Sequence, residues 1–217
     1  MDLFSRSLTA LMAAIGDLPD EDFERPSGCA GWLVRDLACH LTLGAQDVLI
    51  TLVTPAEGEP TVDEVTYWHL VEPPTGDDPF DALIPRLADA YGEPRLLKHH
   101  LDDLGSAADR AAALADPAGR VGTRDEIITV ADFLSVYVLE WTLHHLDLVA
   151  HLAAAPAPPA ETLAASRTAL ERIAGTPFPA SFSDEDALRA GTGRRAPTEA
   201  ETAALGPFAG ALPLILG

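Results

Sequence analysis

Basic residues, cysteines and long apolar runs are all scarce in this chain. Only 14 of its 217 residues are Lys or Arg, against 34 Asp and Glu, and the formal net charge is −20. So acidic a surface repels phosphate groups, which argues against a nucleic acid or an anionic membrane as partner. No apolar run approaches the roughly 18 residues that a membrane-spanning helix needs. We therefore expect a soluble, cytoplasmic protein.

The two cysteines, Cys29 and Cys39, are too few for a disulfide framework and belong to no CxxC or CxxH zinc pattern. We expect both thiols to be reduced. The chain is nevertheless long enough, and with 47% apolar residues apolar enough, to bury a substantial core. One domain, or one domain with a smaller appendage, fits this length.

Most of the chain shows the apolar spacing of amphipathic helices. We predict long helices over residues 2–17, 32–53, 79–114, 130–152 and 161–174, and a short helix from Thr198 to Gly206. Pro85 and the Gly92-Glu93-Pro94 stretch should kink or interrupt the third of these helices. The N-terminal segment lacks the basic start of an export signal and is read as an amphipathic helix. Residues 55–79 and 117–126 are predicted to be loops.

The stretch over residues 130–152 is a nearly apolar helix that carries one polar stripe. Glu140, His144, Asp147 and His151 are spaced four, three and four residues apart. At 3.6 residues per turn these offsets place all four on one face, with Glu140 and His144 roughly 6 Å apart along the axis. Ionisable groups inside an apolar protein must be paired or bound to a cation, because unpaired burial costs several kcal/mol. A site is therefore expected here.

The spacing alone leaves two interpretations of Glu140 and His144 open. They could be a hydrogen-bonded pair on a partly exposed helix, or two ligands of a metal ion with open coordination positions, as in catalytic zinc sites. His40, in the middle of the second predicted helix, is placed to point toward the interior or its rim. His151 lies about 10 Å beyond His144 along the axis, so contact at the rim is expected rather than ligation.

Other polar residues are expected to have structural roles. His145 points about 100° away from His144 and should be packed or exposed. His99 and His100 diverge on their helix and should lie on a solvated face. Cys39 is read as a buried structural thiol, and Cys29 as a loop residue near a cleft mouth that does not act as a nucleophile.

Two motifs give the chain a family resemblance. The run of residues 29–41, CAGWLVRDLACHL, and the later run 140–148, EWTLHHLDL, together resemble the mycothiol-dependent maleylpyruvate isomerase N-terminal family. This family is part of the larger group of DinB-like four-helix metalloproteins. The tail, with Thr192-Gly193-Arg194 and the apolar end over residues 212–216, also looks like the C-terminal part of many such bacterial proteins.

The resemblance implies an all-α, DinB-like four-helix bundle over residues 1–155, with a short C-terminal helical extension over residues 156–217 packed on it. It also implies that His40, Glu140 and His144 hold a divalent metal, zinc first and nickel as the alternative. Asp147 matches the acidic residue of the family's H-x-x-D pattern and would orient a ligand or position the helix. Arg194 matches a recurrent position and is expected to anchor the tail on carbonyls or acids.

The function implied is a metal-dependent transferase or isomerase that uses mycothiol or another small thiol as cosubstrate and an electrophile as substrate. Family members often carry an Arg about one turn before the ligand Glu, where this chain has Val136 and Tyr137. We therefore expect the metal site rather than the specific isomerase activity. The alternative is a non-catalytic metal-binding sensor or interaction module on the same scaffold; a third reading is a structural homologue with an empty pocket. A homodimer is compatible with the sequence.

Overall fold

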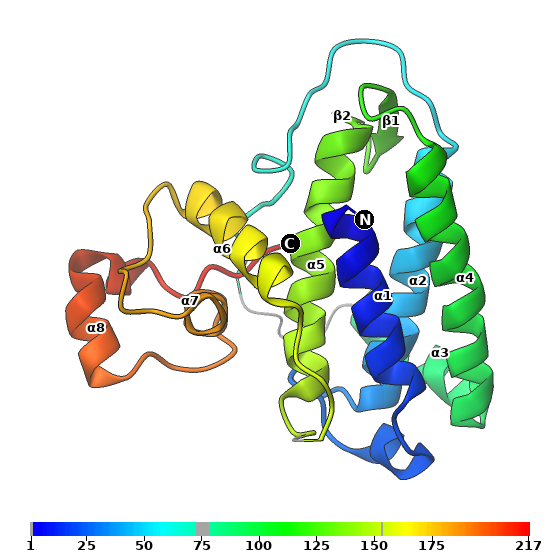
Figure 1. Cartoon of the computed structure of the whole chain (residues 1–217), viewed down its shortest axis with the longest axis horizontal. Helices are drawn as coiled ribbons and strands as arrows, with labels where there is room; N and C mark the ends of the chain where they lie inside the picture. Colours follow the sequence, from blue (N-terminus) through cyan, green and yellow to red (C-terminus); the bar gives the residue numbers. More distant parts are fainter. Residues whose placement is uncertain (1, 73–78, 153) are drawn as a thin grey trace.

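The computed structural model describes residues 2–72, 79–152 and 154–217 of the chain (Figure 1). The protein is mostly helical: over these ranges it has eight α-helices and one small two-stranded sheet, and 61% of it is helix when the 3₁₀ segments are included. Within the same ranges, no helix combines the length and the apolarity that crossing a membrane requires.

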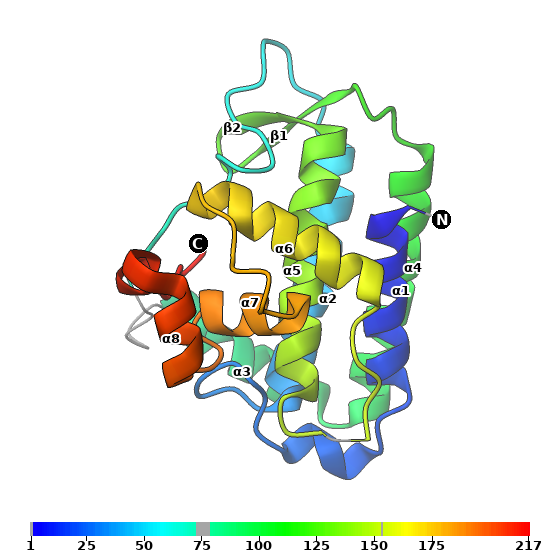
Figure 2. The ribbon, with the colours of Figure 1, turned by 60° about the vertical axis from the view of Figure 1, so that its left-hand side comes forward.

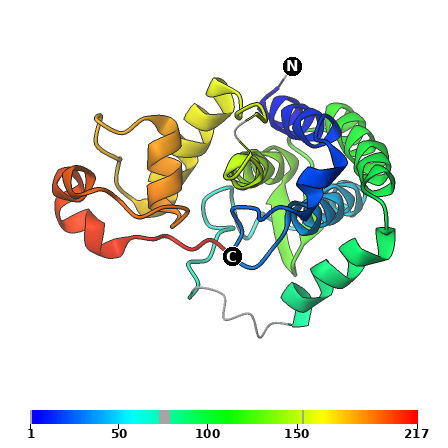
Figure 3. The same cartoon turned by 90° about the horizontal axis from the view of Figure 1, so that it is seen from below.

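Four long helices lie side by side and enclose the main core (Figure 3). They are α1 (Leu3–Gly16), α2 (Val34–Leu52), α4 (Pro94–Leu114) and α5 (Val130–Val149). Helix α2 packs on α4 and α5, and α1 packs on α4 and α5. The predicted ranges for α1, α2 and α5 are confirmed to within a few residues at each end.

The third predicted helix is interrupted, as its Gly-Glu-Pro stretch indicates. Helix α3 (Pro79–Tyr91) ends before Gly92, whose φ of +69° lies in the left-handed region that favours glycine. Helix α4 then starts with Pro94 at its first turn, where the missing N–H of proline is tolerated. The break lets α3 and α4 pack separately against α2.

A β-hairpin stands where the sequence predicts a loop. Strand β1 (Arg120–Thr123) pairs antiparallel with β2 (Glu126–Thr129), with Arg120 opposite Thr129. The two residues between the strands, Arg124 and Asp125, both have positive φ, as a two-residue hairpin turn of type I′ requires. The expectation of an all-α chain is thus too narrow, and residues 120–129 are its exception. The hairpin leads directly into α5, whose N-cap Thr129 accepts a hydrogen bond from the Asp132 amide.

The C-terminal segments pack on the outer side of α5 (Figure 2). Helix α6 (Ala160–Ala174) contacts α5, and α7 (Asp184–Gly191) contacts α6. The predicted short helix is present as α8 (Glu199–Leu205), with a capping box of Thr198 and Glu201, and a 3₁₀ turn, η2 (Gly206–Ala211), follows it. The end of the chain returns to the body, where Val71 donates its amide to the carbonyl of Ile215.

Helix α5 is the element that joins the two halves of the apolar interior. Its residues Phe133, Trp141 and Leu148 belong to the core shared with α1, α2 and α4. Leu139, Leu143 and Leu146 belong to a second core with Phe178, Phe182, Leu188 and Leu214 of the C-terminal segments. Because α5 is buried on nearly every side, any polar side chain on it needs a partner inside the protein.

Candidate functional site

Helix α5 brings Glu140, His144 and Asp147 onto one face, as their spacing predicts. The Glu140 Oε1 lies 3.2 Å from the His144 Nε2, and the His144 Nδ1 lies 3.1 Å from the Asp147 Oδ2. The side chain of Glu140 is 27% exposed and that of His144 14%, whereas that of Asp147 is only 3% exposed. Exposure of these three side chains therefore falls along the helix, from Glu140 at the partly open end to Asp147 at the buried end.

His40 reaches the same place from α2. Its Nε2 lies 3.5 Å from the Glu140 Oε1, and its ring meets that of His144 edge to face, with the centroids 4.8 Å apart. The ring of Trp32, just before α2, packs against His40 with a centroid distance of 5.3 Å. The His40 side chain remains 33% exposed. The packing of α2 on α5 thus brings together the three side chains that the resemblance implies as ligands.

These three residues have the donors and the spacing of a cation site. Their two imidazole nitrogens and one carboxylate oxygen all lie within 4.8 Å of one another. Ligands that surround a zinc ion tetrahedrally at 2.0–2.3 Å lie about 3.3–3.7 Å apart, and the separations of 3.2 and 3.5 Å at Glu140 are close to this range. The residues therefore fit a divalent metal with open positions on the exposed side.

The pKa values of Glu140 and His144 favour opposite charges on these two neighbouring side chains. Burial alone would raise the pKa of Glu140, but His144 and His40 beside it hold that pKa well below its ordinary value. Burial would lower the pKa of His144, but Glu140 and Asp147 raise that pKa well above its ordinary value. A carboxylate thus faces an imidazolium, and a metal ion would replace the proton as the positive charge.

Asp147 ties the site to the C-terminal extension. Both of its carboxylate oxygens accept hydrogen bonds from Arg194, at 2.9 Å from Nε to Oδ1 and 2.7 Å from Nη2 to Oδ2. Burial would raise the pKa of Asp147, but His144 and Arg194 hold it far below its ordinary value. Because a carboxylate can only accept, the His144 Nδ1 carries the proton in this hydrogen bond, and its Nε2 is left facing Glu140. Arg194 therefore anchors the tail on an acid, one of the two partner types expected for it.

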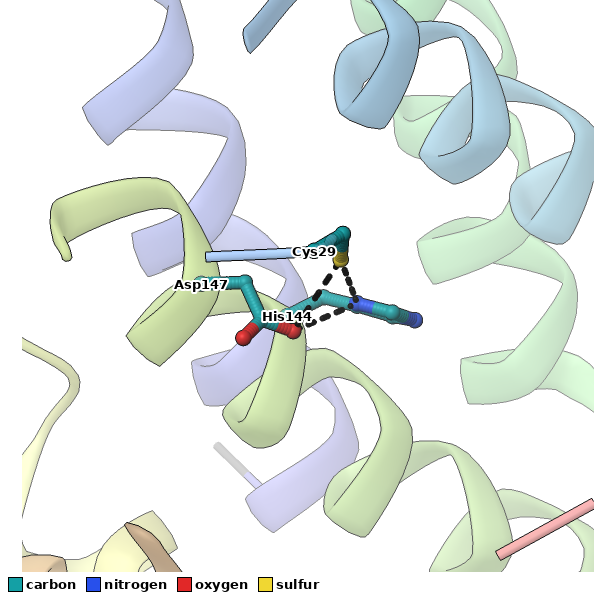
Figure 4. A group of neighbouring side chains, drawn as sticks. All are labelled: Cys29, His144 and Asp147. Atoms are coloured by element: carbon teal, nitrogen blue, oxygen red, sulfur yellow. Dashed lines mark hydrogen bonds and ion pairs between the residues drawn. The ribbon is translucent and has the colours of Figure 1, made fainter. Parts of the chain in front are cut away.

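Cys29 lies against the far edge of the same imidazole (Figure 4). Its Sγ is 3.8 Å from the His144 Nδ1 and 3.4 Å from the Asp147 Oδ2. The neighbouring Gly28 makes this approach possible: its amide donates to the Asp147 carbonyl at 2.7 Å, and a Cβ on it would lie 2.7 Å from the Asp147 Cα. The thiol and the carboxylate share one nitrogen, so the relay of a Cys-His-Asp nucleophile, which needs both nitrogens, is not formed.

The remaining candidate residues have the structural roles expected for them. His145 is buried and bonds the Pro156 carbonyl at 2.9 Å. His99 is exposed and lies 3.4 Å from Asp103, and His100 bonds the Tyr91 hydroxyl at 2.6 Å. Cys39 is buried, and burial together with Asp36 raises its pKa to about 11. His151 lies beyond the end of α5 at Val149, so the prediction that it continues the polar face of this helix is wrong. It is exposed, and in the described part of the chain no metal-ligand grouping includes it.

The site borders a loop that the sequence marks as a long connection. Tyr67, on the segment after α2, is buried; burial raises its pKa, Arg124 opposes this shift, and Asp47 and Glu140 add to it. Tyr137 of α5 donates its hydroxyl proton to Asp47 of α2 at 2.7 Å. The phenols of Tyr67 and Tyr137 and the carboxylate of Asp47 therefore lie near Glu140, in addition to the proposed ligands. Of the predicted 55–79 connection, residues 73–78 lie outside the described residues.

Comparison with known proteins gives one match. The family model described as the mycothiol maleylpyruvate isomerase N-terminal domain matches residues 4–149, more than half of the chain. No curated protein and no solved structure matches the chain. The matched range contains His40, Glu140, His144 and Asp147, whereas Arg194 lies beyond it. The chain belongs to the mycothiol maleylpyruvate isomerase N-terminal domain family.

Proposed function

We propose that this protein is a metal-dependent enzyme that joins a small thiol to an electrophile, as a transferase or an isomerase. The observation that carries the proposal is the convergence of His40, Glu140 and His144, from two helices, with nitrogen and oxygen donors within 4.8 Å of one another. The family points to mycothiol-related chemistry on such a scaffold. We also propose a DinB-like four-helix bundle over residues 1–155 as the part that holds the metal, with residues 156–217 packed on it.

The chain's own residues would prepare the site for a metal and a thiol. A divalent metal, zinc in the first place, would act as a Lewis acid that lowers the pKa of a thiol bound to it. Asp147 holds one proton of His144 on Nδ1, so a metal would replace the other proton, on Nε2, and bind there. His40 and Glu140 are the most exposed of the three, so the thiol would enter on their side.

The reaction then follows from the chemistry of a thiolate. Its sulfur would add to an electrophilic carbon of a double bond in the second substrate, and the π electrons of that bond would move to the neighbouring carbon. A proton from solvent, replacing the one that the thiol lost, would then give an S-conjugate. If the adduct instead rotates about the former double bond and expels the thiolate, the product is the cis–trans isomer and the thiol is recovered. In both outcomes no side chain of this protein would become covalently attached to the thiol or to the second substrate.

Calorimetry tests this proposal directly. We expect zinc-loaded protein to bind one thiol from a panel that includes mycothiol, and we expect the heat of binding to disappear in the His40→Ala variant and in the metal-free protein. Its matched control is His99→Ala, which removes an exposed imidazole on α4 and should leave the heat unchanged. If loaded wild-type protein shows no heat with any thiol, the enzyme proposal fails, and a metal-binding module without a thiol cosubstrate is the reading that stands.

A further inference from the structure

The imidazole of His144 lies between two sets of possible metal ligands. On its Nε2 side are Glu140 and His40, the proposed site. On its Nδ1 side are Cys29 and Asp147, and the three separations in this second set are 3.1, 3.4 and 3.8 Å (Figure 4). These values also bracket the spacing of about 3.3–3.7 Å expected around a tetrahedral ion. Thiolate, imidazole and carboxylate are all zinc ligands, and the thiolate favours thiophilic ions.

The two sets compete for one histidine. A neutral imidazole has a single nitrogen with a free lone pair, and the other nitrogen carries the proton. An ion bound through Nε2 therefore leaves the proton on Nδ1, which donates it to Asp147. An ion bound through Nδ1 would replace that proton, and the hydrogen bond to Asp147 would be lost. Because the donors fit on both sides, a charged group fixed beside one of the two sets would decide which set holds the ion.

Arg194 is the residue that distinguishes the two sides. Its guanidinium bonds both oxygens of Asp147, and the Oδ2 that faces His144 and Cys29 is the closer of the two, at 2.7 Å from Nη2. The guanidinium is held in turn by Thr192, whose Oγ1 accepts from Nη1 at 2.9 Å. A fixed positive charge on this carboxylate repels a second cation and occupies the oxygen that would ligate it. In the described part of the chain, the ion pairs of Glu140 are with His40 and His144, so no guanidinium is paired with the Nε2 set.

We propose that Arg194 selects the position of the ion: it closes the Cys29–His144–Asp147 set to divalent cations and so keeps the metal on Nε2. Without this guanidinium, the second set binds a thiophilic ion. The Cys29 thiol and the His144 Nδ1 then each release a proton to solvent, and His144 keeps its proton on Nε2, where it is donated to Glu140. That Arg194 keeps the metal on Nε2 rests on the proposed function. That the second set binds an ion without Arg194 needs only Cys29, His144 and Asp147. Because Arg194 lies outside the residues matched by the family, ion selection depends on the C-terminal extension.

Cobalt(II) is a suitable probe, because a cysteine thiolate bound to it gives a near-ultraviolet charge-transfer band and nitrogen and oxygen ligands do not. We expect cobalt-loaded wild-type protein to show the visible bands of a bound ion without the thiolate band. Arg194→Met should gain the thiolate band, and adding Cys29→Ser to that variant should remove it. Arg194→Gln, which keeps a hydrogen-bond donor toward Asp147, tests the same loss of charge with less disturbance of packing, and circular dichroism checks the fold of both variants.

Two controls separate charge from general loosening of the extension. Arg194→Lys keeps a positive charge and should retain the wild-type spectrum. Arg195→Met removes the neighbouring guanidinium, which pairs with Asp186 and Glu201 instead, and should give no thiolate band. A thiolate band in the wild type, or its absence from folded Arg194→Met and Arg194→Gln, would overturn the inference. If the wild type binds no cobalt, the proposed function fails. The second half of the inference is then still decided by whether Arg194→Met and Arg194→Gln show the thiolate band.

Discussion

Replacing His40 with alanine is expected to weaken zinc binding by more than about 100-fold. Loss of a group that only orients a ligand typically costs 10–100-fold in metal affinity, and His40 is proposed to be a ligand itself. Its side chain is one-third exposed, so the substitution should leave the fold intact. The affinity is measured by competition with a chromophoric chelator, on protein freed of metal and titrated back with zinc.

The matched control for this prediction is His99→Ala, which should bind zinc as the wild type does. His99 is 72% exposed, and its nearest charged partner is Asp103 on the same helix. If His40→Ala retained wild-type affinity, the ion would not lie between α2 and α5. If both variants lost affinity equally, zinc would be binding to surface histidines.

Asp147→Ala is expected to destabilise the protein by about 3–5 kcal/mol, the range for breaking a buried ion pair by removing one partner. The Asp147 carboxylate is 3% exposed, and the change would leave Arg194 and the Nδ1 of His144 facing each other without an anion. Denaturant unfolding followed by circular dichroism gives the difference in the free energy of unfolding. Asp103→Ala, which breaks an exposed pair with His99, should cost less than about 1 kcal/mol.

The difference in the free energy of unfolding between wild type and Asp147→Ala depends on pH in a direction that the pKa of Asp147 fixes. The folded-state pKa of Asp147 is depressed, so its contribution to stability is fully present above its unfolded pKa of about 3.9. The contribution is lost as the pH falls through the lower, folded value. Asp147 also raises the pKa of His144, and that contribution is fully present only below the unfolded His pKa of about 6.5. The gap between wild type and Asp147→Ala should therefore be constant from about pH 6 to about pH 5 and should narrow in more acidic solution. A gap that widened with acid would refute the pairing.

The part of the site that lies on one helix could be predicted from the sequence. Glu140, His144 and Asp147 share a face of α5 because helical geometry fixes offsets of four and three residues. His40 is different, since its approach to Glu140 depends on how α2 packs against α5. Only the family resemblance joins these two segments in advance.

The contacts of Cys29 and Arg194 could not be predicted in the same way. Cys29 comes from a loop before α2, and Arg194 follows α7, 47 residues beyond its partner Asp147. No local period relates a loop residue to a residue on a distant helix, so the spacing of the sequence carries no signal for either contact. Gly28 is the nearest to a clue, because the close approach to α5 requires a residue without a side chain.

The β1–β2 hairpin and helix α7 are absent from the elements predicted above, for different reasons. The β1–β2 hairpin has strands of four residues and a turn of Arg124-Asp125, which lacks the Asn-Gly or Asp-Gly signal of a type I′ turn. Helix α7 did have a signal: Ser183 caps it by accepting from the Asp186 amide, and three acidic residues fill its first turn. Its eight residues are too few for a visible apolar period.

The most direct test of the central claim is a crystal structure of the zinc-loaded protein with diffraction data collected on both sides of the zinc absorption edge. We predict one anomalous peak per chain, at about 2.0–2.2 Å from the Nε2 atoms of His40 and His144 and from a carboxylate oxygen of Glu140. A fully loaded crystal with its peak elsewhere, and with His40, Glu140 and His144 bonded only to one another, would contradict the account.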